Sequence, residues 1–576
     1  MTTKAMTGAQ ALVKCLENEG VEYIWGLPGG AALPIYDALV GSRIKLILVR
    51  HEQGATHMAD GYARATGKTG VVLVTSGPGA TNTLTGIMTA HMDSVPMIAI
   101  TGQTISSMLG KDAFQEADVF GLSMPIVKHS YLVRRTEDIP RIVRESFHIA
   151  GSGRPGPVVI DIPKDFSAAP FAGDLHPDMD LPGYHHAGEK PVAEADVMAI
   201  AEALSKSRRP VLLVGHGALI SGAQEVVRRL AEKLKAPVTT TLLGKGAFPE
   251  SHRLSLGMLG MHGTAYANKA MVECDLVMSI GSRFDDRIIG RQAMFCRNAT
   301  RIHIDIDTSE FGRMIACHHY CAGDAKTVLE ALMPHVGELN TAEWLATLER
   351  YKRRYPLTYK RRGGLKMQHI MATLNDMLGG KGIIATDVGQ HQMWAAQFLK
   401  TERPNNWLSS GGAGTMGYGF PAAVGAQFGR PGEAVWAIVG DGGFQMTMSE
   451  LATAAVNRLP VKVIVMNNSY LGMVRQWQTL FYDDRKSGVD LEGNPDFARL
   501  AETYEGALGL TLRRAADVKK VLKKAMDHTR GPTVINALVE KTDNLFPMIP
   551  PGAALEDMLI KEPRKSTKLA KPTGST

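Results

Sequence analysis

Short runs of apolar and β-branched residues recur along the chain, and most of them end in glycine, aspartate or asparagine. Such runs are typical of strands that are buried on both faces of a parallel sheet. Stretches compatible with helices lie between them, for example residues 223–235 and 447–458. The pattern predicts an α/β fold. The expected strands are residues 44–50, 71–76, 97–101, 157–162, 210–214, 275–280, 301–305, 382–387, 435–439 and 461–466.

Two segments interrupt this alternation. Residues 167–195 are rich in proline, glycine, alanine and histidine, and residues 336–366 end in a basic stretch that contains Pro356. Both compositions are typical of linkers. They predict three parallel-sheet α/β domains, over residues 1–170, 190–335 and 367–550, followed by a C-terminal tail over residues 551–576.

The excess of basic residues is local. The chain of 576 residues holds 64 Lys and Arg against 57 Asp and Glu, a net charge of +7. Residues 351–366 hold seven basic and no acidic residues, and residues 561–576 add five basic residues and one glutamate. The rest of the chain is therefore slightly acidic. We interpret the two basic segments as a solvated linker and tail, and expect no nucleic-acid partner.

Composition excludes several other classes of protein. Hydrophobic residues make up 44% of the chain and charged residues 21%, which is ordinary for a globular protein and not for a disordered one. Five cysteines are too few for a disulfide scaffold at this length. The first twenty residues lack the apolar core of a signal peptide, and no apolar run approaches the length of a membrane span. We expect a soluble, cytoplasmic protein.

One motif indicates a metal and a phosphate ligand. The predicted strand 435–439 runs into Gly440-Asp441-Gly442-Gly443, and the next strand ends at Asn467-Asn468. Between them, Thr447-x-x-Glu450 has the pattern of a capping box that opens a helix. Carboxyl ends of neighbouring parallel strands form one edge, where α/β sheets bind ligands. Oxygens of Asp441 and Asn468, with a backbone carbonyl near Tyr470, suit Mg²⁺, although two ordinary turns are the alternative.

The same motif resembles the signature of enzymes that use thiamine diphosphate (ThDP). Similarity to the acetohydroxyacid synthases, the acetolactate synthase large-subunit family, covers nearly the whole chain. It is carried by residues 26–39 (GLPGGAALPIYDAL), 50–64 (RHEQGATHMADGYAR), 283–287 (RFDDR), 411–421 (GGAGTMGYGFP), 472–478 (GMVRQWQ) and 548–558 (MIPPGAALEDM). The resemblance implies domains for the ThDP pyrimidine, for FAD and for the ThDP diphosphate, in that order. The implied cofactors are ThDP, Mg²⁺ and FAD.

The resemblance also assigns roles near ThDP. The family glutamate that matches Glu52 hydrogen-bonds N1′ of the aminopyrimidine and favours the tautomer whose 4′-imino group acts as a base. The bulky residue that matches Met416 holds the cofactor in a bent shape. Gly412-x-Gly414-x-x-Gly417 also fits a dinucleotide fingerprint, but no acidic strand end follows at the required distance. The other implied ThDP contacts are Gln390, His391, Gly414, Gly442, Gly443, Asn468, Gly472 and Met473.

Further positions are implied for substrate and FAD. Trp477 matches a tryptophan that distinguishes 2-ketoacids by one methylene, and Arg287 a residue that can hold a carboxylate. Phe114, Gln115, Gly29 and Gly30 match residues near the reacting atoms. Arg154, His262, Arg283, Asp305 and Asp324 match the FAD site, where FAD is structural. RFDDRIIG departs from the usual RFDDRVTG, which leaves the shape of this pocket open.

The implied function is acetolactate synthesis. Pyruvate is decarboxylated, and the two-carbon unit is joined to pyruvate or 2-ketobutyrate, which gives 2-acetolactate or 2-aceto-2-hydroxybutyrate for branched-chain amino-acid synthesis. The family places the site between two subunits, which implies a homodimer or tetramer, and often adds a small regulatory subunit. The alternatives are another ThDP-dependent 2-ketoacid decarboxylase, a pyruvate oxidase, or a non-catalytic nucleotide-binding protein.

Overall fold

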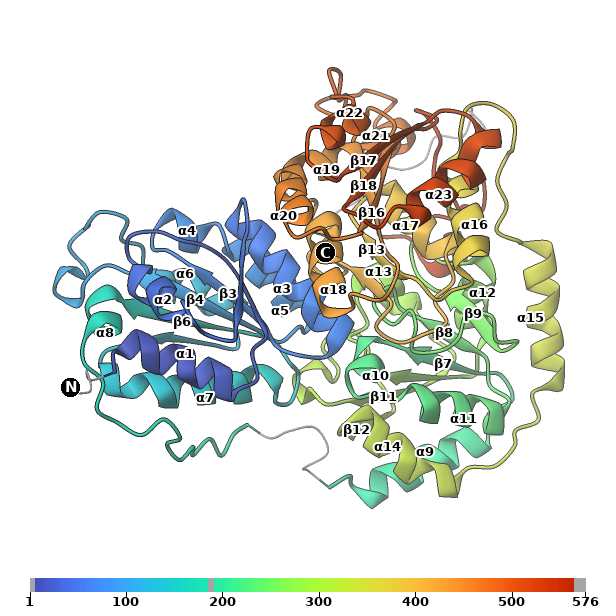
Figure 1. Cartoon of the computed structure of the whole chain (residues 1–576). Helices are drawn as coiled ribbons and strands as arrows, with labels where there is room; N and C mark the ends of the chain where they lie inside the picture. Colours follow the sequence, from blue (N-terminus) through green and yellow to red (C-terminus); the bar gives the residue numbers. More distant parts are fainter. Residues whose placement is uncertain (1–5, 185–190, 564–576) are drawn as a thin grey trace.

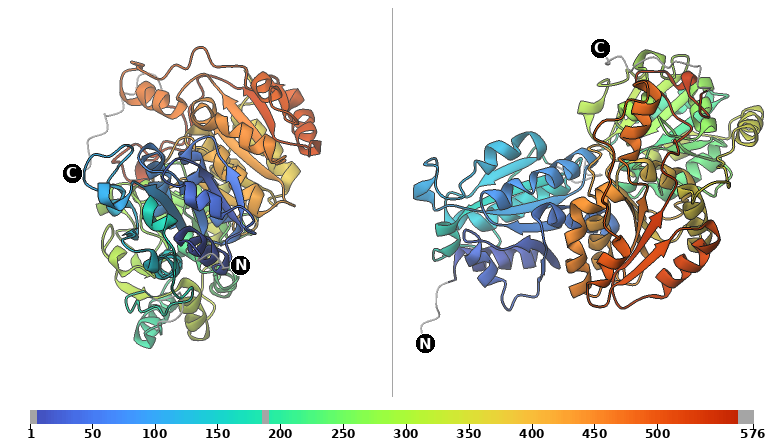
Figure 2. Two further views of the ribbon diagram at one scale, coloured as in Figure 1. Left: turned by 60° about the vertical axis from the view of Figure 1, so that its left-hand side comes forward. Right: turned by 90° about the horizontal axis from the view of Figure 1, so that it is seen from above.

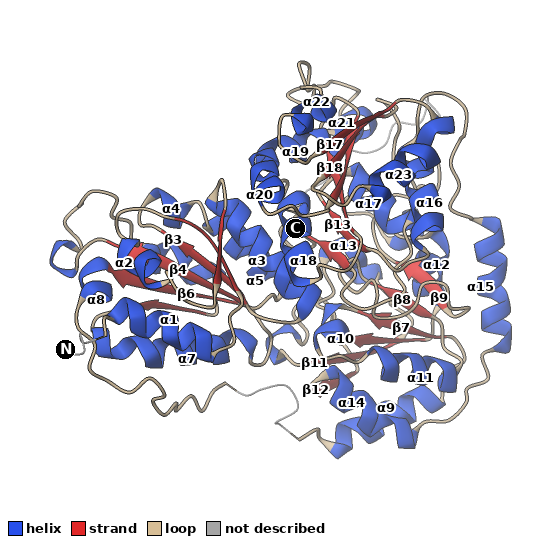
Figure 3. Ribbon diagram, viewed as in Figure 1, coloured by secondary structure: helices blue, strands red, loops and turns tan. Residues whose placement is uncertain are grey.

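The computed structural model describes residues 6–184 and 191–563. Within them lie three six-stranded sheets flanked by helices, and all neighbouring strands are parallel (Figures 1 and 3). This confirms the predicted α/β fold. No helix of the described part is both long and apolar enough to cross a bilayer.

The N-terminal domain is built on a sheet with strand order β2-β1-β3-β4-β6-β5. Its strands are β1 (Tyr23–Leu27), β2 (Lys45–Leu48), β3 (Gly70–Val74), β4 (Met97–Gln103), β5 (His129–Leu132) and β6 (Pro157–Pro163). Its helices are α1 (Gly8–Asn18), α2 (Leu33–Ala38), α3 (Glu52–Thr66), α4 (Pro78–Thr81), α5 (Leu84–Asp93), α6 (Val119–Ser123), α7 (Ile139–Gly151) and α8 (Lys164–Ala168). Gly67 ends α3 because its positive φ of 76° is favourable only for glycine.

The central domain has the strand order β12-β11-β10-β7-β8-β9. Its strands are β7 (Pro210–Val214), β8 (Val238–Thr240), β9 (Ser255–Met258), β10 (Leu276–Ile280), β11 (Thr300–Asp305) and β12 (His319–Ala322). Its helices are α9 (Glu194–Ser205), α10 (His216–Ile220), α11 (Gln224–Leu234), α12 (Ala265–Glu273), α13 (Asp286–Ile289), α14 (Ala325–Leu332) and α15 (Ala342–Arg354).

The C-terminal domain has the strand order β14-β13-β15-β16-β18-β17. Its strands are β13 (Ile383–Thr386), β14 (Trp407–Ser409), β15 (Val435–Gly440), β16 (Lys462–Asn467), β17 (Leu508–Leu512) and β18 (Thr533–Leu538). Its helices are α16 (Met367–Leu378), α17 (Gln390–Phe398), α18 (Gly419–Gly429), α19 (Asp441–Thr447), α20 (Leu451–Val456), α21 (Gly472–Phe481), α22 (Phe497–Glu502) and α23 (Val518–Asp527).

Both predicted linker regions need correction in part, since the first overlaps α8 at residues 167–168 and α9 at residues 194–195. Residues 342–354 of the second form α15, which packs on the central domain through buried Trp344 and Leu348. Three of the seven basic residues, Lys352, Arg353 and Arg354, lie in the last turn of this helix, and the other four follow it. Part of the predicted tail also packs, because Leu555 joins a core of the central domain. Residues 185–190 of the first linker and 564–576 of the tail lie outside the described residues.

The predicted capping box at Thr447 and Glu450 is wrong. The Thr447 hydroxyl donates to the carbonyl of Gly417, and no side-chain cap forms there. Glu450 is fully buried and accepts the backbone N–H groups of Arg50 and His51 from the N-terminal domain, at 3.0 Å each. The carboxylate therefore satisfies donors just before α3, 400 residues away in sequence.

The N-terminal and C-terminal domains share one apolar core. It contains Trp25 and Met58 from the first and Val424 and Phe444 from the second. Two glycines let α3 and α18 approach closely: a Cβ on Gly61 would lie 2.1 Å from the carbonyl oxygen of Ala422, and one on Gly425 would lie 1.9 Å from that of Met58. Figure 2 shows the blue N-terminal domain against the orange part of the C-terminal domain from two further sides.

This close contact generates a prediction. Gly425→Ala should lower the free energy of unfolding by about 1–3 kcal/mol, because the added methyl group forces two backbones apart. Chemical denaturation measures the change. Gly151→Ala is the matched control, since a Cβ there meets no atom within 4 Å. Equal stability of the two variants would contradict the proposed role of the helix contact.

Candidate functional site

A small cavity of about 60 Å³ lies at the carboxyl ends of β13, β15 and β16. β15 and β16 are adjacent and pair Gly440 with Met466, so Asp441 and Asn468 follow neighbouring strand ends. Both residues line the cavity. The cavity also brings together most of the expected ThDP residues: Gln390, His391, Met416, Gly442, Gly443, Tyr470, Gly472 and Met473.

The predicted metal ligands form an oxygen-rich, buried group. Asp441 is 1% exposed, and burial raises the pKa of its carboxyl to about 6. Asn494 donates to Asp441 Oδ2 at 2.7 Å, and the N–H of Tyr470 donates to Asn468 Oδ1 at 3.0 Å. A divalent cation would offset the cost of the buried charge, and oxygen ligands suit Mg²⁺. Sequence reasoning missed Asn494, which follows no strand end or motif.

Two buried polar atoms beside this cavity have no hydrogen-bond partner among the described residues: Gln390 Oε1 and His391 Nε2. The Gln390 amide nitrogen donates to the carbonyl of Asp543 at 2.9 Å, which fixes the orientation of the amide. Burial lowers the pKa of His391 to about 3. Buried polar atoms are rarely left unpaired, so the two atoms indicate that a polar ligand completes the site.

A glycine next to the same cavity keeps the space open. A Cβ on Gly472 would lie 2.3 Å from Gln390 Oε1. Any side chain there would therefore displace Gln390. Together with Gly442 and Gly443, it lets the backbone approach a bound group closely. The donor set and the glycines fit a diphosphate held through a metal ion.

A second cavity, of about 570 Å³, adjoins the first through Met416 and Met473, which line both. Residues of all three domains form its wall. They include every expected FAD residue, namely Arg154, His262, Arg283, Asp305 and Asp324, together with Gly414 and the expected substrate residues Arg287 and Trp477. The volume is ordinary for a site that holds a sizeable organic ligand.

Several features of this cavity fit a nucleotide cofactor. Gly217 and Gly281 lie in contact, since a Cβ on Gly217 would be 2.8 Å from the Cα of Gly281. His262 is buried, burial lowers its pKa to about 4, and its Nδ1 has no partner among the described residues. Arg154 is held by ion pairs of 3.2 Å to Asp307 and 2.8 Å to Glu310.

Five expected residues do not line either cavity: Gly29, Gly30, Glu52, Phe114 and Gln115. They belong to the N-terminal domain, near the carboxyl ends of its strands. Gly79 approaches Glu52 Oε1, since a Cβ there would lie 3.6 Å away, and Gly77 approaches the carbonyl of Gln115. Asn82, which sequence reasoning missed, donates to Glu52 Oε2 at 2.9 Å. The chain thus carries two separate groups of site residues.

Exposed apolar side chains are frequent on the segments that carry the N-terminal group. Phe114 is 88% exposed. Other large apolar side chains on the same segments are exposed as well: Leu33, Ile105, Met108, Phe120, Leu122 and Met124. A concentration of exposed apolar side chains of this kind is typical of a protein–protein interface.

Comparisons with known proteins agree with this geometry. Three families match: "Thiamine pyrophosphate enzyme, N-terminal TPP binding domain" at residues 6–122, "Thiamine pyrophosphate enzyme, central domain" at residues 197–332, and "Thiamine pyrophosphate enzyme, C-terminal TPP binding domain" at residues 387–537. Their ranges fall on the three sheets.

Relatives that match over nearly the full length identify the family more specifically. The chain is 47% identical to an acetolactate synthase of Mycobacterium bovis, over 96% of this chain and 91% of that protein. It is 47% identical to an acetolactate synthase of Arthrospira platensis, over 96% and 98%. It is also 47% identical to an acetolactate synthase large subunit of Parasynechococcus marenigrum, over 96% and 91%. The chain belongs to the acetolactate synthase large-subunit family of thiamine pyrophosphate enzymes.

Proposed function

We propose that the protein decarboxylates pyruvate and joins the two-carbon unit to a second 2-ketoacid, pyruvate or 2-ketobutyrate. The products are 2-acetolactate and 2-aceto-2-hydroxybutyrate, the precursors of branched-chain amino acids. The observation that carries this proposal is the pair of adjoining cavities. The Asp441 and Asn468 oxygens line one, Trp477 and Arg287 line the other, and Met416 borders both.

Asp441, Asn468 and a backbone carbonyl near Tyr470 hold Mg²⁺ in this proposal, and Gln390 and His391 flank the diphosphate. When bound, ThDP supplies a carbon nucleophile that adds to the keto group and an electron sink for the loss of CO₂. Met416 fixes its orientation from the wall shared by the two cavities.

Glu52 acts on the cofactor of a second copy of this chain. It does not line the cavities of its own chain, and the exposed apolar surface around Phe114 supports a homodimer. Asn82 occupies Glu52 Oε2, which leaves Oε1 for a proton shared with the pyrimidine ring of ThDP. A proton held between Glu52 Oε1 and the pyrimidine ring favours the loss of a proton from another position of ThDP. Gly30 and Gln115 approach the reacting atoms from the same side.

The larger cavity holds FAD in a structural role. Joining two 2-ketoacids with loss of CO₂ involves no net transfer of electrons to an acceptor, so the reaction needs no redox cofactor. Arg154 and Arg283 provide positive charge for a diphosphate, and Asp305 and Asp324 provide acceptors for ribose hydroxyls. The "large subunit" names of relatives support a small subunit as an additional partner.

Trp477 and Arg287 select the second substrate. Trp477 lines the cavity as a broad apolar wall, and Arg287 is more than half exposed, with only a weak ion pair of 3.8 Å to Asp286. Its guanidinium is therefore available for the carboxylate of a 2-ketoacid. One methylene in such a pocket is worth about 1–3 kcal/mol, which separates 2-ketobutyrate from pyruvate.

Product analysis tests the proposed function directly. With Mg²⁺, ThDP, FAD and pyruvate, we expect 2-acetolactate, and addition of 2-ketobutyrate should divert flux to 2-aceto-2-hydroxybutyrate. Chromatography with mass detection identifies both. Acetaldehyde as the main product would indicate a simple decarboxylase, and peroxide a pyruvate oxidase. Absence of turnover with bound ThDP would indicate a non-catalytic protein.

Glu52→Gln should reduce kcat at least a hundredfold while ThDP binding stays nearly unchanged, because the amide keeps the shape but cannot supply the proton. Steady-state kinetics and calorimetric ThDP titration measure the two effects. Glu145→Gln is the matched control, a buried glutamate of the same domain that bonds Tyr131 and Arg141. Near-normal turnover of Glu52→Gln would refute the proposed role.

Asp441→Ala should weaken binding of Mg²⁺ and ThDP more than tenfold, because it removes a charged oxygen ligand. Titration of the variant with ThDP at fixed Mg²⁺ gives the affinity. Asp376→Ala, which changes an exposed carboxylate on α16 of the same domain, should leave it unaltered. If both variants bind alike, Asp441 is not a metal ligand.

A further inference from the structure

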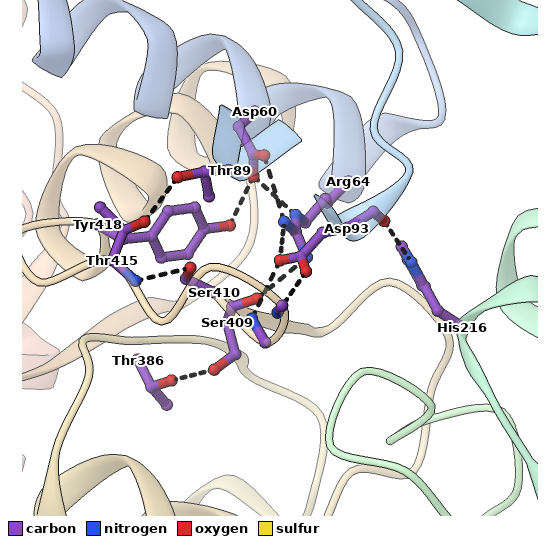
Figure 4. A network of polar contacts seen from close by, with 12 residues as sticks. Asp60, Arg64, Thr89, Asp93, His216, Thr386, Ser409, Ser410, Thr415 and Tyr418 are labelled. Atoms are coloured by element: carbon purple, nitrogen blue, oxygen red, sulfur yellow. Dashed lines mark hydrogen bonds and ion pairs between the residues drawn. The ribbon is translucent and has the colours of Figure 1, made fainter. Parts of the chain in front are cut away.

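A buried network of charges lies where the three domains meet (Figure 4). Arg64, in the last turn of α3, donates from Nε to Asp60 Oδ1 at 2.7 Å and from Nη2 to Asp93 Oδ2 at 2.8 Å. The Arg64 side chain is 5% exposed and both carboxylates are fully buried. Burial alone would lower the pKa of Arg64, but Asp60, Tyr418 and Asp93 outweigh it and raise that pKa.

These residues hold one loop of the C-terminal domain, the β14–α18 loop (residues 410–418). At its start, the N–H groups of Gly411 and Gly412 donate to Asp93 Oδ2 and Oδ1, at 3.0 and 2.7 Å. Arg64 Nη1 donates to the carbonyl of Ser409, directly before the loop, at 3.1 Å. At its end, the Tyr418 hydroxyl donates to Asp60 Oδ1 at 2.6 Å. The N-terminal domain thus fixes both ends.

The middle of the loop has one further hydrogen bond to the N-terminal domain, while within the C-terminal domain the N–H of Gly417 donates to Asp387 and its carbonyl accepts from Thr447. The hydroxyl oxygens of Thr89 and Thr415 lie 2.7 Å apart, and both side chains are buried. Thr415 is followed by Met416, which borders both cavities, and preceded by Gly414, which lines the larger one. The part of the loop that faces the cavities is therefore held by α5 of the N-terminal domain as well as by its own domain.

The network also reaches the central domain. The carbonyl oxygen of Asp93 lies 2.9 Å from His216 Nδ1, at the start of α10. Asp93 and His216 both line the larger cavity. Asp93 therefore connects three parts of the chain: α5 through its own backbone, the β14–α18 loop through its carboxylate, and α10 through its carbonyl.

We propose that Arg64 and Asp93 are positioning residues. They hold the β14–α18 loop, and Met416 within it, in the geometry that ThDP requires. Neither residue lines the smaller cavity, so toward that cavity they act through the loop, while Asp93 also lines the larger cavity. The part of this inference that concerns the cofactor rests on the proposed function. The part that concerns the loop does not.

The chemistry of Asp93 makes the proposal specific. Its two carboxylate oxygens each accept one glycine N–H, and Oδ2 also accepts Arg64. An asparagine has the same shape but only one acceptor oxygen, so in either orientation its NH₂ group would face a backbone N–H, and in one of them the guanidinium as well. Asp93→Asn should therefore release the loop while changing almost no packing volume.

Hydrogen exchange of the protein without added cofactor tests this step. In Asp93→Asn, the peptide that covers residues 410–418 should exchange at least tenfold faster than in the unaltered protein, and peptides from β10 and β16 should not change. Thr89→Val removes a single hydrogen bond to the loop and should have a smaller effect in the same peptide. This variant keeps the test possible if Asp93→Asn does not fold.

Asp161→Asn is the matched control. Asp161 is as buried as Asp93, lies in the same domain and accepts hydrogen bonds from Thr101 and Gln103, but it does not contact the loop. Faster exchange of residues 410–418 in this control would show that any buried Asp→Asn change destabilises the domain, and it would overturn the proposal. Unchanged exchange in Asp93→Asn would overturn it as well.

Kinetics complete the test. The ThDP concentration for half-maximal activity should rise at least tenfold in Asp93→Asn, with a smaller fall in kcat at saturation, whereas Asp161→Asn should keep the wild-type value. A change in hydrogen exchange without a change in ThDP dependence would overturn the inference that the loop geometry serves ThDP binding. Lack of ThDP binding by the unaltered protein would refute the proposed function, while the exchange result would still decide the role of Arg64 and Asp93.

Discussion

Close contact between α3 and α18 is the constraint on which the arrangement of the site depends. Gly61 and Gly425 place two helix backbones where any side chain would collide, and an apolar core spans both domains around them. Once the helices are this close, Glu450 lies beside the backbone before α3. Arg64, at the other end of the same helix, lies beside the β14–α18 loop. One helix contact therefore sets both ends of α3 against the domain that carries the cofactor residues.

Much of the fold was predictable because buried parallel strands leave a local signal. All ten predicted strands are present, and the eight strands that were missed include β5, β9 and β12, which carry polar residues that obscure the pattern. The Asp441 and Asn468 arrangement was also predictable, since adjacent parallel strands place their carboxyl ends together. These features follow from short-range pattern and sheet geometry alone.

Other features depend on contacts between distant segments, and no local pattern encodes them. Glu450 matched a capping box, but its carboxylate satisfies backbone donors of another domain, because that interaction is available only after the domains pack. Asn494 and Asn82 each support a site residue from a loop, with nothing in their neighbourhood that signals it. The separation of Glu52 from Asp441 was expected only through the family resemblance, which places the site between two subunits, and no local pattern signals it.

The distance in sequence between the two sides of the buried charge network has a consequence for biosynthesis. Gly411 follows Asp93 by 318 residues, so at ribosomal rates the N-terminal domain waits roughly 15–60 s for the loop that covers it. During this interval Asp60, Arg64 and Asp93 can pair with water and with one another. An apolar contact at this place would enlarge the apolar face that the shared core already leaves exposed on the nascent domain, whereas these charged side chains stay hydrated until the loop emerges.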